Sequence, residues 1–405
     1  MKNMAAILGV LLFVLTILAQ EIQQEASAIN VEVPVRVLKG DAFVDNLTID
    51  DFEVYEDGIP QEIAAVYFIK KTSIERQEEK KKFIPKTQRH FFLFFEISDY
   101  TKRLAEGLSY FFENVLIPGD NLTIVSPLKT YIFDSESLDT MTSEEIVSEL
   151  QGILRKDALI GNAEYRSAIM DIQRMARQMG ALMGSPEDQA LSGGDAHLYE
   201  KDIDEVFSHY IVLLDKLESL RQVEEQKLLD FANYLQDREG QKFVILFYQR
   251  EFIPQLDSRL LGQVGQMYQD LPNLMFQLQT IQGFSSRKVS FDLERVKQAY
   301  SDSSISIHFL FFTEPAEHVP GVQFVEQSED IFSAFSEMAL ASGGFVESSS
   351  NPEYLFQRAS EASENYYLIY YSPKNYQADG KFKNITVKVK DKDCRVSHRV
   401  GYFAD

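Results

Sequence analysis

A run of apolar residues near position 90 has the pattern of a strand that is buried on both faces. Residues 91–95 are all apolar, and three polar residues, Glu96, Ser98 and Asp99, follow almost at once. Continuous runs of this kind are typical of central strands in parallel sheets. Apolar residues at helical spacing come next: Leu104, Leu108, Phe111, Phe112 and Val115. We therefore expect a strand–turn–helix unit with polar residues at the carboxyl end of its strand, where open α/β sheets bind ligands.

The alternation of strands and helices continues over residues 88–363. Apolar runs at 121–125, 242–248 and 305–312 predict further strands, and helical patterns lie between them. Strands that alternate with helices favour a mostly parallel sheet. We therefore expect an α/β fold in which a doubly wound sheet is covered by helices on both faces.

The stretch at about 163–237 contains more helix than such a sheet requires. Apolar residues recur at helical spacing from Ala163 to Met183 and again from Ile203 to about Leu235. This spacing is typical of amphipathic helices and predicts a helical insertion. Two arrangements remain open, a helical hairpin that projects from the sheet and a helix pair that lies flat on it.

Beyond the first 28 residues, both ends of the chain have the two-residue period of β-strands. Valines alternate with other residues over 31–37 in an amino-terminal segment at 29–70, and a carboxyl-terminal segment at 364–405 also alternates. Neither segment has enough strands to be stable alone. We expect the two to form the halves of one discontinuous β-sandwich. The charged stretch at 71–87 is typical of a linker.

The first 28 residues have the pattern of an export signal. Lys2 precedes a short apolar core at 4–19, and small residues at 26–28 suit a cleavage site. The apolar core is at the short end for a membrane span. We therefore expect 1–28 to be a signal peptide, with an uncleaved anchor as the alternative. The prediction is an exported protein that is periplasmic, extracellular or on the cell surface.

Charge and motif content narrow the classes of function. The formal net charge of −22 argues against a nucleic-acid partner, because phosphate binding needs a basic face. The chain has one cysteine, Cys394, so it cannot form an internal disulfide. The six histidines share no ligand spacing, and no Walker loop, Gly-x-Ser-x-Gly elbow or His-Glu-x-x-His motif occurs. We therefore expect no catalytic residues, and a hydrolase has no support.

The two ends of the chain carry a family resemblance. Residues 51–58 read Asp-Phe-Glu-Val-Tyr-Glu-Asp-Gly, residues 366–373 read Tyr-Tyr-Leu-Ile-Tyr-Tyr-Ser-Pro, and 399–403 read Arg-Val-Gly-Tyr-Phe. These motifs resemble the opening and the ending of the VWFA-related family of exported bacterial proteins. Pro118-Gly119-Asp120 is similar to the usual sequence before the second strand of von Willebrand factor type A domains. The resemblance implies a von Willebrand factor A-like sheet domain within the α/β fold.

The resemblance also implies a metal-ion-dependent adhesion site, from which this sequence departs. In the family, Asp-x-Ser-x-Ser follows the first strand, a later loop adds Thr, and Asp follows the fourth strand. Here Glu96 stands for the first Asp, Ser98 is kept, and Tyr100 replaces the second Ser. The later loop offers Asn162 in place of Thr, and Tyr248-Gln249-Arg250-Glu251 replaces the final Asp-Gly.

Two hypotheses follow from these departures. In the first, the metal site is degenerate, no cofactor binds, and Glu96 pairs with a protein cation such as Arg250 or with a hydrogen-bond donor. The protein is then a non-enzymatic protein-binding or scaffold protein with a protein partner, no nucleic acid, and no membrane contact beyond the export signal. In the second, Glu96, Ser98, Asp99 and Asn162 form a rebuilt site for Mg²⁺ or Ca²⁺. The protein is then a divalent-cation-dependent adhesin.

Overall fold

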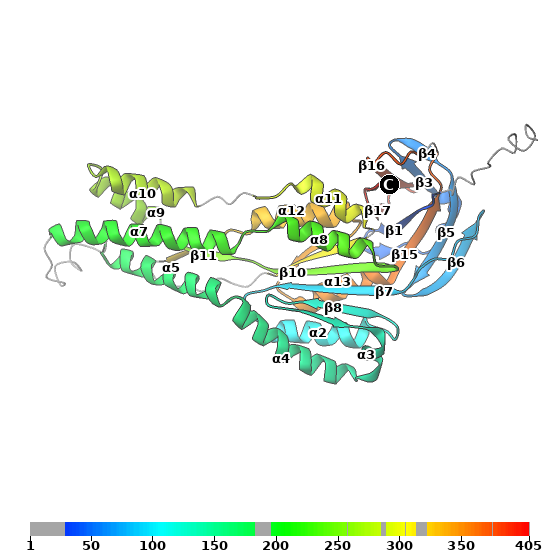
Figure 1. Ribbon diagram of the computed structural model, residues 1–405, viewed down its shortest axis with the longest axis horizontal. Coiled ribbons are helices and arrows are strands. Elements are labelled where there is room, and N and C mark those ends of the chain that lie inside the picture. The colour runs from blue at the N-terminus through cyan, green and yellow to red at the C-terminus, as the bar shows by residue number, and fades with distance from the viewer. Residues whose placement is uncertain are drawn as a thin grey trace, which may run out of the picture.

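The chain is a mixed α/β protein built on one central sheet (Figure 1). The expected signal peptide at 1–28 lies outside the residues that the structure describes. No helix of the described chain is both long and apolar enough to cross a membrane. The computed structural model describes residues 29–182, 196–256, 258–284, 289–303, 305–312, 322–374 and 376–404.

The central sheet has the strand order β14-β12-β10-β7-β8-β9. All neighbours are parallel except β8 and β9, so the expectation of a mostly parallel sheet is confirmed. The apolar run that opens the α/β region forms β7, which lies between β10 and β8. The strands are β7 (Arg89–Glu96), β8 (Asn121–Val125), β9 (Thr130–Phe133), β10 (Gln241–Gln249), β12 (Ile305–Phe312) and β14 (Phe345–Ser349).

Helices cover one face of this sheet over β7, and we call this side the packed face. Its helices are α2 (Lys102–Asn114), α4 (Ser143–Gly161) and α13 (Pro352–Glu364), with the short α3 (Ser135–Thr140) beside them. Phe91, Leu93 and Phe95 of β7 are buried against this layer. Thr142 starts α4 with a capping box in which the Glu145 side chain bonds back to the Thr142 amide.

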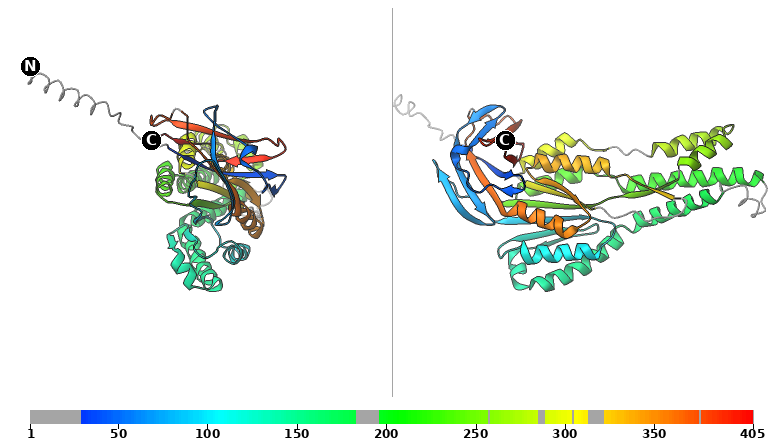
Figure 2. Two further views of the ribbon diagram at one scale, coloured as in Figure 1. Left: turned by 90° about the vertical axis from the view of Figure 1, so that its right-hand side faces the viewer. Right: turned by 180° about the vertical axis from the view of Figure 1, so that it is seen from behind.

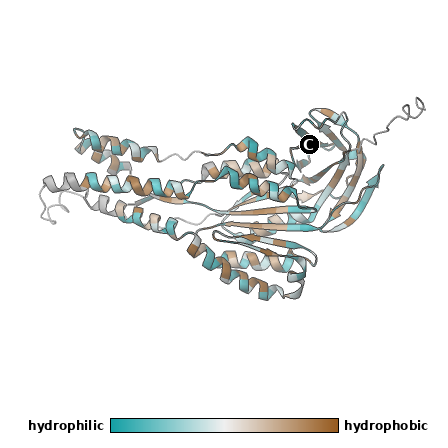
Figure 3. Cartoon of the chain, viewed as in Figure 1, coloured by the Kyte–Doolittle hydropathy of each residue, from teal (hydrophilic) through white to brown (hydrophobic). Residues whose placement is uncertain are grey.

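The opposite face, which we call the cavity face, carries α8 (Glu225–Gln236), α11 (Leu293–Asp302) and α12 (Glu329–Ala341). Phe92 is buried there, but Phe94 is only half-buried. The expectation that all five apolar residues of β7 are buried is therefore wrong for Phe94. Figure 3 shows apolar residues along the central strands and along the helices that pack on them.

Strands from the two ends of the chain share sheets. One sheet has the order β17-β1-β15-β5-β6, with β2 added beside β1, and the other has the order β18-β16-β3-β4. A common core joins them, in which Val33, Tyr367 and Val387 are buried. The strands are β1 (Val31–Lys39), β2 (Ala42–Phe43), β3 (Phe52–Glu56), β4 (Ile59–Gln61), β5 (Ile63–Lys70), β6 (Ser73–Glu79), β15 (Asn365–Tyr371), β16 (Phe382–Val389), β17 (Arg395–His398) and β18 (Gly401–Phe403), with the turn η1 (Ile49–Asp51) between β2 and β3.

The expected linker at 71–87 is wrong in its first half. Residues Ser73–Glu79 form β6, which pairs with β5 at the edge of the sheet. An edge strand needs few apolar residues, and charged side chains on an edge discourage pairing with other chains. The Tyr67 hydroxyl donates to the Glu79 carboxylate at 2.6 Å and fixes the end of β6. The charged residues at 73–79 therefore form an edge strand and not a linker.

A helical arm extends from the central sheet on the side opposite the two end sheets (Figures 1 and 2). Its helices share one core, in which Ile172, Phe207, Tyr210 and Leu278 are buried. The described structure thus has a projecting arrangement, one of the two that the helical pattern left open. The arm consists of α5 (Ala163–Leu182), α7 (Ala196–Leu220), α9 (Ser258–Met267) and α10 (Pro272–Gly283), with a ribbon of β11 (Phe252–Leu256) and β13 (Val322–Glu326).

The expected insertion at about 163–237 is wrong in its boundaries. The long helix ends at Leu220, and α8 turns back to pack Leu229, Ala232 and Leu235 on the central sheet. The arm instead gains residues 252–283, which lie beyond the expected boundary. Helical spacing shows that a helix has an apolar side, but it does not show which surface covers that side.

Candidate functional site

The carboxyl ends of β7 and β10 form the candidate site, because these parallel neighbours end side by side. Tyr248 of β10 pairs in register with Glu96 of β7, so Gln249 lies next to the residues that follow β7. The Gln249 Oε1 atom accepts hydrogen bonds from the Ser98 amide at 2.9 Å and the Ser98 hydroxyl at 3.2 Å. It also accepts from the Asp99 amide at 3.2 Å. One neutral amide oxygen thus holds the turn after β7.

The side chains of Asp99 and Asn162, two further residues of the expected ligand set, have different partners. The Asp99 carboxylate forms an ion pair with Arg166 of α5. The Asn162 amide nitrogen donates to the backbone oxygens of Ile97 at 2.9 Å and Ala158 at 3.0 Å. Asn162 follows α4, so these bonds tie the end of that helix to the strand end. Ser98, Asp99 and Asn162 are neighbours in space, but their polar groups point to different partners.

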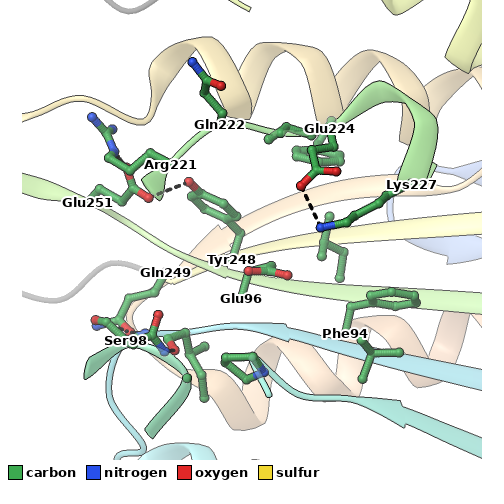
Figure 4. A pocket seen from close by; sticks show the side chains of 18 of the residues that line it. Phe94, Glu96, Ser98, Arg221, Gln222, Glu224, Lys227, Tyr248, Gln249 and Glu251 are labelled. Atoms are coloured by element: carbon green, nitrogen blue, oxygen red, sulfur yellow. Dashed lines mark hydrogen bonds and ion pairs between the residues drawn. The ribbon is translucent and has the colours of Figure 1, made fainter. Parts of the chain in front are cut away.

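A cavity of about 760 Å³ lies beside this turn on the cavity face (Figure 4). It is bounded by the strand ends, by α8, and by the roots of α5 and α7, so it lies at the base of the arm. Its volume is in the range of roughly 300–1,000 Å³ that is typical of small-ligand sites. Apolar walls come from residues that include Phe94, Leu128, Phe231, Val244, Leu246 and Met338.

The Glu96 side chain points into this cavity. Within the described residues, it forms no hydrogen bond or ion pair, so the expectation of a protein partner for Glu96 is wrong. Alternation along β7 explains this, because Glu96 follows Phe92 and Phe94 on the cavity face. Solvent reaches the side chain inside the cavity, and the surrounding protein atoms desolvate the carboxylate. This desolvation, with a smaller effect of the negative charge of Glu251, raises the pKa of Glu96 to about 7.

The cations that line the cavity are paired with other acids. Arg221 forms an ion pair with Glu251, whose carboxylate also accepts from the Tyr248 hydroxyl at 3.0 Å. Lys227 lies 2.7 Å from the Glu224 carboxylate.

Arg250, the cation expected to affect Glu96, turns away from it. Its guanidinium bonds to Glu326 of β13 at 2.7 Å and lies 4.7 Å from the centre of the Phe311 ring. The geometry thus places Arg250 at the base of the ribbon, and no described cation pairs with Glu96.

Tyr100, which stands in place of the second serine, also turns away from the cavity. Its ring packs against the core of the packed face, and burial raises the pKa of its hydroxyl. Glu96, Ser98, Asp99 and Asn162 therefore do not converge on one point in the described structure. The described residues contain no group of three or more His, Cys, Asp or Glu side chains placed to hold a metal ion.

Sequence reasoning missed two residues that shape the site. The sequence presents Gln249 only as a departure from the family pattern, although its place at the end of a buried strand is a signal for contact with the neighbouring strand end. Arg221 gave no signal, because it lies within a stretch expected to be continuous helix. It is in fact in the break between α7 and α8, where it donates to the backbone oxygen of Gln327 at 2.6 Å.

Comparisons with known proteins add little to this description. No protein-family model matches the chain. A search of curated proteins also finds no match. Among solved structures, the crystal structure of the human COPII-coat protein Sec24c is similar at a TM-score of 0.29 and 7% identity, covering 80% of this chain and 44% of that one. The chain thus spans less than half of that protein's chain, and a similarity this low carries no argument.

Proposed function

We propose that this chain is an exported, non-enzymatic protein-binding or scaffold protein of the VWFA-related type. Its α/β region would be a von Willebrand factor A-like domain with a degenerate metal site, and its partner a protein. The motifs at 51–58, 366–373 and 399–403 support the family, and the mostly parallel sheet agrees with it. The charge of −22 argues against nucleic acid, and residues 1–28 support export to the periplasm, the cell surface or the medium.

The geometry at the strand ends supports a degenerate site. Gln249, one of the four residues that replace the family's final Asp-Gly, offers a neutral oxygen and is bonded to Ser98 and Asp99. Asp99 is paired with Arg166. A hard divalent cation requires several oxygen ligands around one point, and these groups are already engaged with other partners.

The observation that carries a binding role is the exposed apolar surface of the arm. Among the described side chains, each of its helices has a large apolar residue that is mostly exposed: Met170 (62%), Val212 (63%), Met267 (63%) and Phe276 (71%). The arm extends away from the rest of the molecule (Figure 2). The exposed fractions show that these side chains are accessible to another protein. Contiguous apolar patches mark protein interfaces, and we propose that these four side chains contribute to one.

Site-specific cross-linking tests this role. A photo-reactive amino acid placed at Phe276, in the full chain expressed in its source cells, should cross-link a protein partner. The same probe at Leu340, which is 61% exposed on α12, is the matched control. The partner is then purified and titrated against the chain in EDTA. We expect saturable binding that a Val212→Ser, Phe276→Ser variant weakens by about tenfold or more, because buried hot-spot residues contribute this much. Equal cross-linking from both positions, or no saturable complex, would contradict the proposal.

The second candidate function is a divalent-cation-dependent adhesin. It is favoured by one observation, the unpaired Glu96 carboxylate in the same cavity as Ser98. Calorimetric titration with Mg²⁺, Mn²⁺ and Ca²⁺ separates the two functions. We expect no saturable heat at millimolar concentration. Saturable heat that disappears in Glu96→Gln, together with loss of partner binding in EDTA, would establish the adhesin instead.

A further inference from the structure

The unbalanced charge of the cavity is negative. Of the acids that line it, Glu224 and Glu251 are paired with Lys227 and Arg221. Glu96 and Glu164, the other two lining acids, have no ion pair within the described residues. The third lining cation, Arg250, is paired with Glu326. A ligand that enters the cavity therefore meets a carboxylate with no counter-charge among the described residues, whereas each described lining cation already has a carboxylate partner.

The walls around Glu96 are apolar and aromatic. Phe94 precedes it on the same face of β7, and Leu246 and Tyr248 of β10 lie beside it. Phe231 of α8 packs edge-on against Phe94, with ring centres 4.7 Å apart. Such rings attract an organic cation through their π faces and bury its apolar body, whereas a small hydrated metal ion gains little from them.

From this geometry, we propose that the cavity binds an organic cation, in which one protonated amine or guanidinium is joined to an apolar body. The cationic group pairs with the Glu96 carboxylate, and the apolar body lies against Phe94, Phe231 and Leu246. The polarity is the reverse of a metal-dependent adhesion site, where the protein presents a positive charge to a carboxylate of the partner. A charged hydrogen bond to a group that is otherwise unpaired is among the stronger polar contacts.

The cation has two possible sources, a free small amine and a Lys or Arg side chain of the protein partner. The second source rests on the proposed function, and it makes the cavity the place where that partner is anchored. The roots of α5 and α7 line the cavity, so a partner bound along the arm could also reach it. The first source requires no protein partner. The test therefore consists of two experiments, one for each source.

The first experiment uses n-hexylammonium as the probe, with hexanol and hexanoate as neutral and anionic controls. Binding to the full chain is measured in EDTA by calorimetry and by protein-observed NMR at pH 8, above the pKa of about 7 of Glu96. The variant is Glu96→Gln, and the matched control is Glu113→Gln, which removes the same charge from an exposed position on the packed-face helix α2. We expect n-hexylammonium to bind more tightly than either control compound. Glu96→Gln should weaken it by about tenfold or more, and Glu113→Gln should leave it unchanged.

The second experiment uses a short peptide with one central lysine between leucine and phenylalanine, and the same peptide with that lysine acetylated. Competition of the free-amine peptide with n-hexylammonium, absent for the acetylated one, supports the proposal with a protein side chain as the source. Binding of n-hexylammonium without the peptide supports it with a small amine as the source. Binding that survives in Glu96→Gln, or that hexanoate matches, overturns it. The Phe276 cross-linking tests the proposed function separately, because that residue lies on the arm and not in the cavity.

Discussion

The two faces of the central sheet differ in how they accommodate a charged residue of the same strand. On the packed face, Arg89 at the start of β7 is fully buried, and its guanidinium donates to Asp120 at 2.6 and 3.0 Å and to the backbone oxygen of Val115. On the cavity face, Glu96 at the end of β7 has no partner within the described residues. One strand can therefore stabilise the fold on one side and present a binding group on the other, because its side chains alternate.

The largest difference between the faces should appear when each charge is removed. Arg89→Met leaves the buried Asp120 carboxylate without its partner, which should lower the free energy of unfolding by about 3–5 kcal/mol. Urea denaturation measures this change. Arg155→Met, at an exposed position on α4, is the control and should change stability by about 0.5 kcal/mol or less. Equal effects of the two substitutions would show that the Arg89–Asp120 pair does not stabilise the packed face.

The two neighbouring phenylalanines of β7 provide a second comparison. Phe95 is 1% exposed on the packed face and stacks on Phe247, with ring centres 4.9 Å apart, whereas Phe94 is half-buried at the cavity. Phe95→Ala should cost about 3–5 kcal/mol, and Phe94→Ala should cost less because part of its surface already meets solvent. Thermal and urea unfolding of the two variants measure the difference. A larger loss for Phe94→Ala would mean that the cavity is closed in solution.

The packed face should also make the protein sensitive to acid. His308 of β12 is fully buried beside Phe243 and Phe345, and this burial, with the charge of Arg36, lowers the pKa of its imidazole to about 3. The unfolded chain binds a proton at His308 near pH 6.5 and the folded chain does not, so stability falls as pH decreases from about 6.5 towards 3. His308→Leu should reduce this loss, as measured by melting temperatures at pH 4 and 7. An unchanged slope would exclude His308 as its source.

The cavity face should show the opposite trend, with a smaller effect. The pKa of Glu96 is about 7 in the folded chain and about 4.5 in the unfolded chain. The folded chain therefore holds the proton more tightly, and the stability that this provides is lost as pH increases from 4.5 through 7. Glu96→Gln should raise the melting temperature relative to the parent at pH 8 and have little effect at pH 4. A variant that is less stable at pH 8 would show that Glu96 has a partner after all.

The central sheet could be predicted from the sequence because its strands are apolar without interruption. A strand such as β7 or β10 has few alternatives, and the helices between them have apolar sides at the expected spacing. The end strands alternate, and each end has too little inner face to be stable alone, so pairing between the ends was expected. The registers of β1 with β15 and of β3 with β16 agree with that expectation. The identity of the family and the division of the chain into separate domains stay predictions.

The candidate site could be predicted only in its location. Continuous apolar runs indicate that Glu96 and Ser98 follow a central strand, but not the partner of each side chain. Gln249 fills the turn because of the register between β7 and β10, and Glu96 lacks a partner because Arg250 turns to Glu326. Such outcomes depend on three-dimensional contacts between segments about 75–150 residues apart, which a local pattern does not contain. The edge strand β6 was missed for the opposite reason, because its charged residues suit both a strand edge and a linker.

The pairing of the two ends also determines when β1 can complete its sheet during synthesis. Glu32 of β1 lies opposite Tyr370 of β15, 338 positions further along the chain, and the Tyr370 hydroxyl donates to the Glu32 carboxylate. At about 5–20 residues per second, the ribosome needs roughly 20–70 s to make the second strand after the first. During this time, the buried valines of β1 lack their main partner strands, β15 and β17. β1 is thus made long before its sheet is completed, and a chain interrupted anywhere before β15 leaves this apolar strand without its partner.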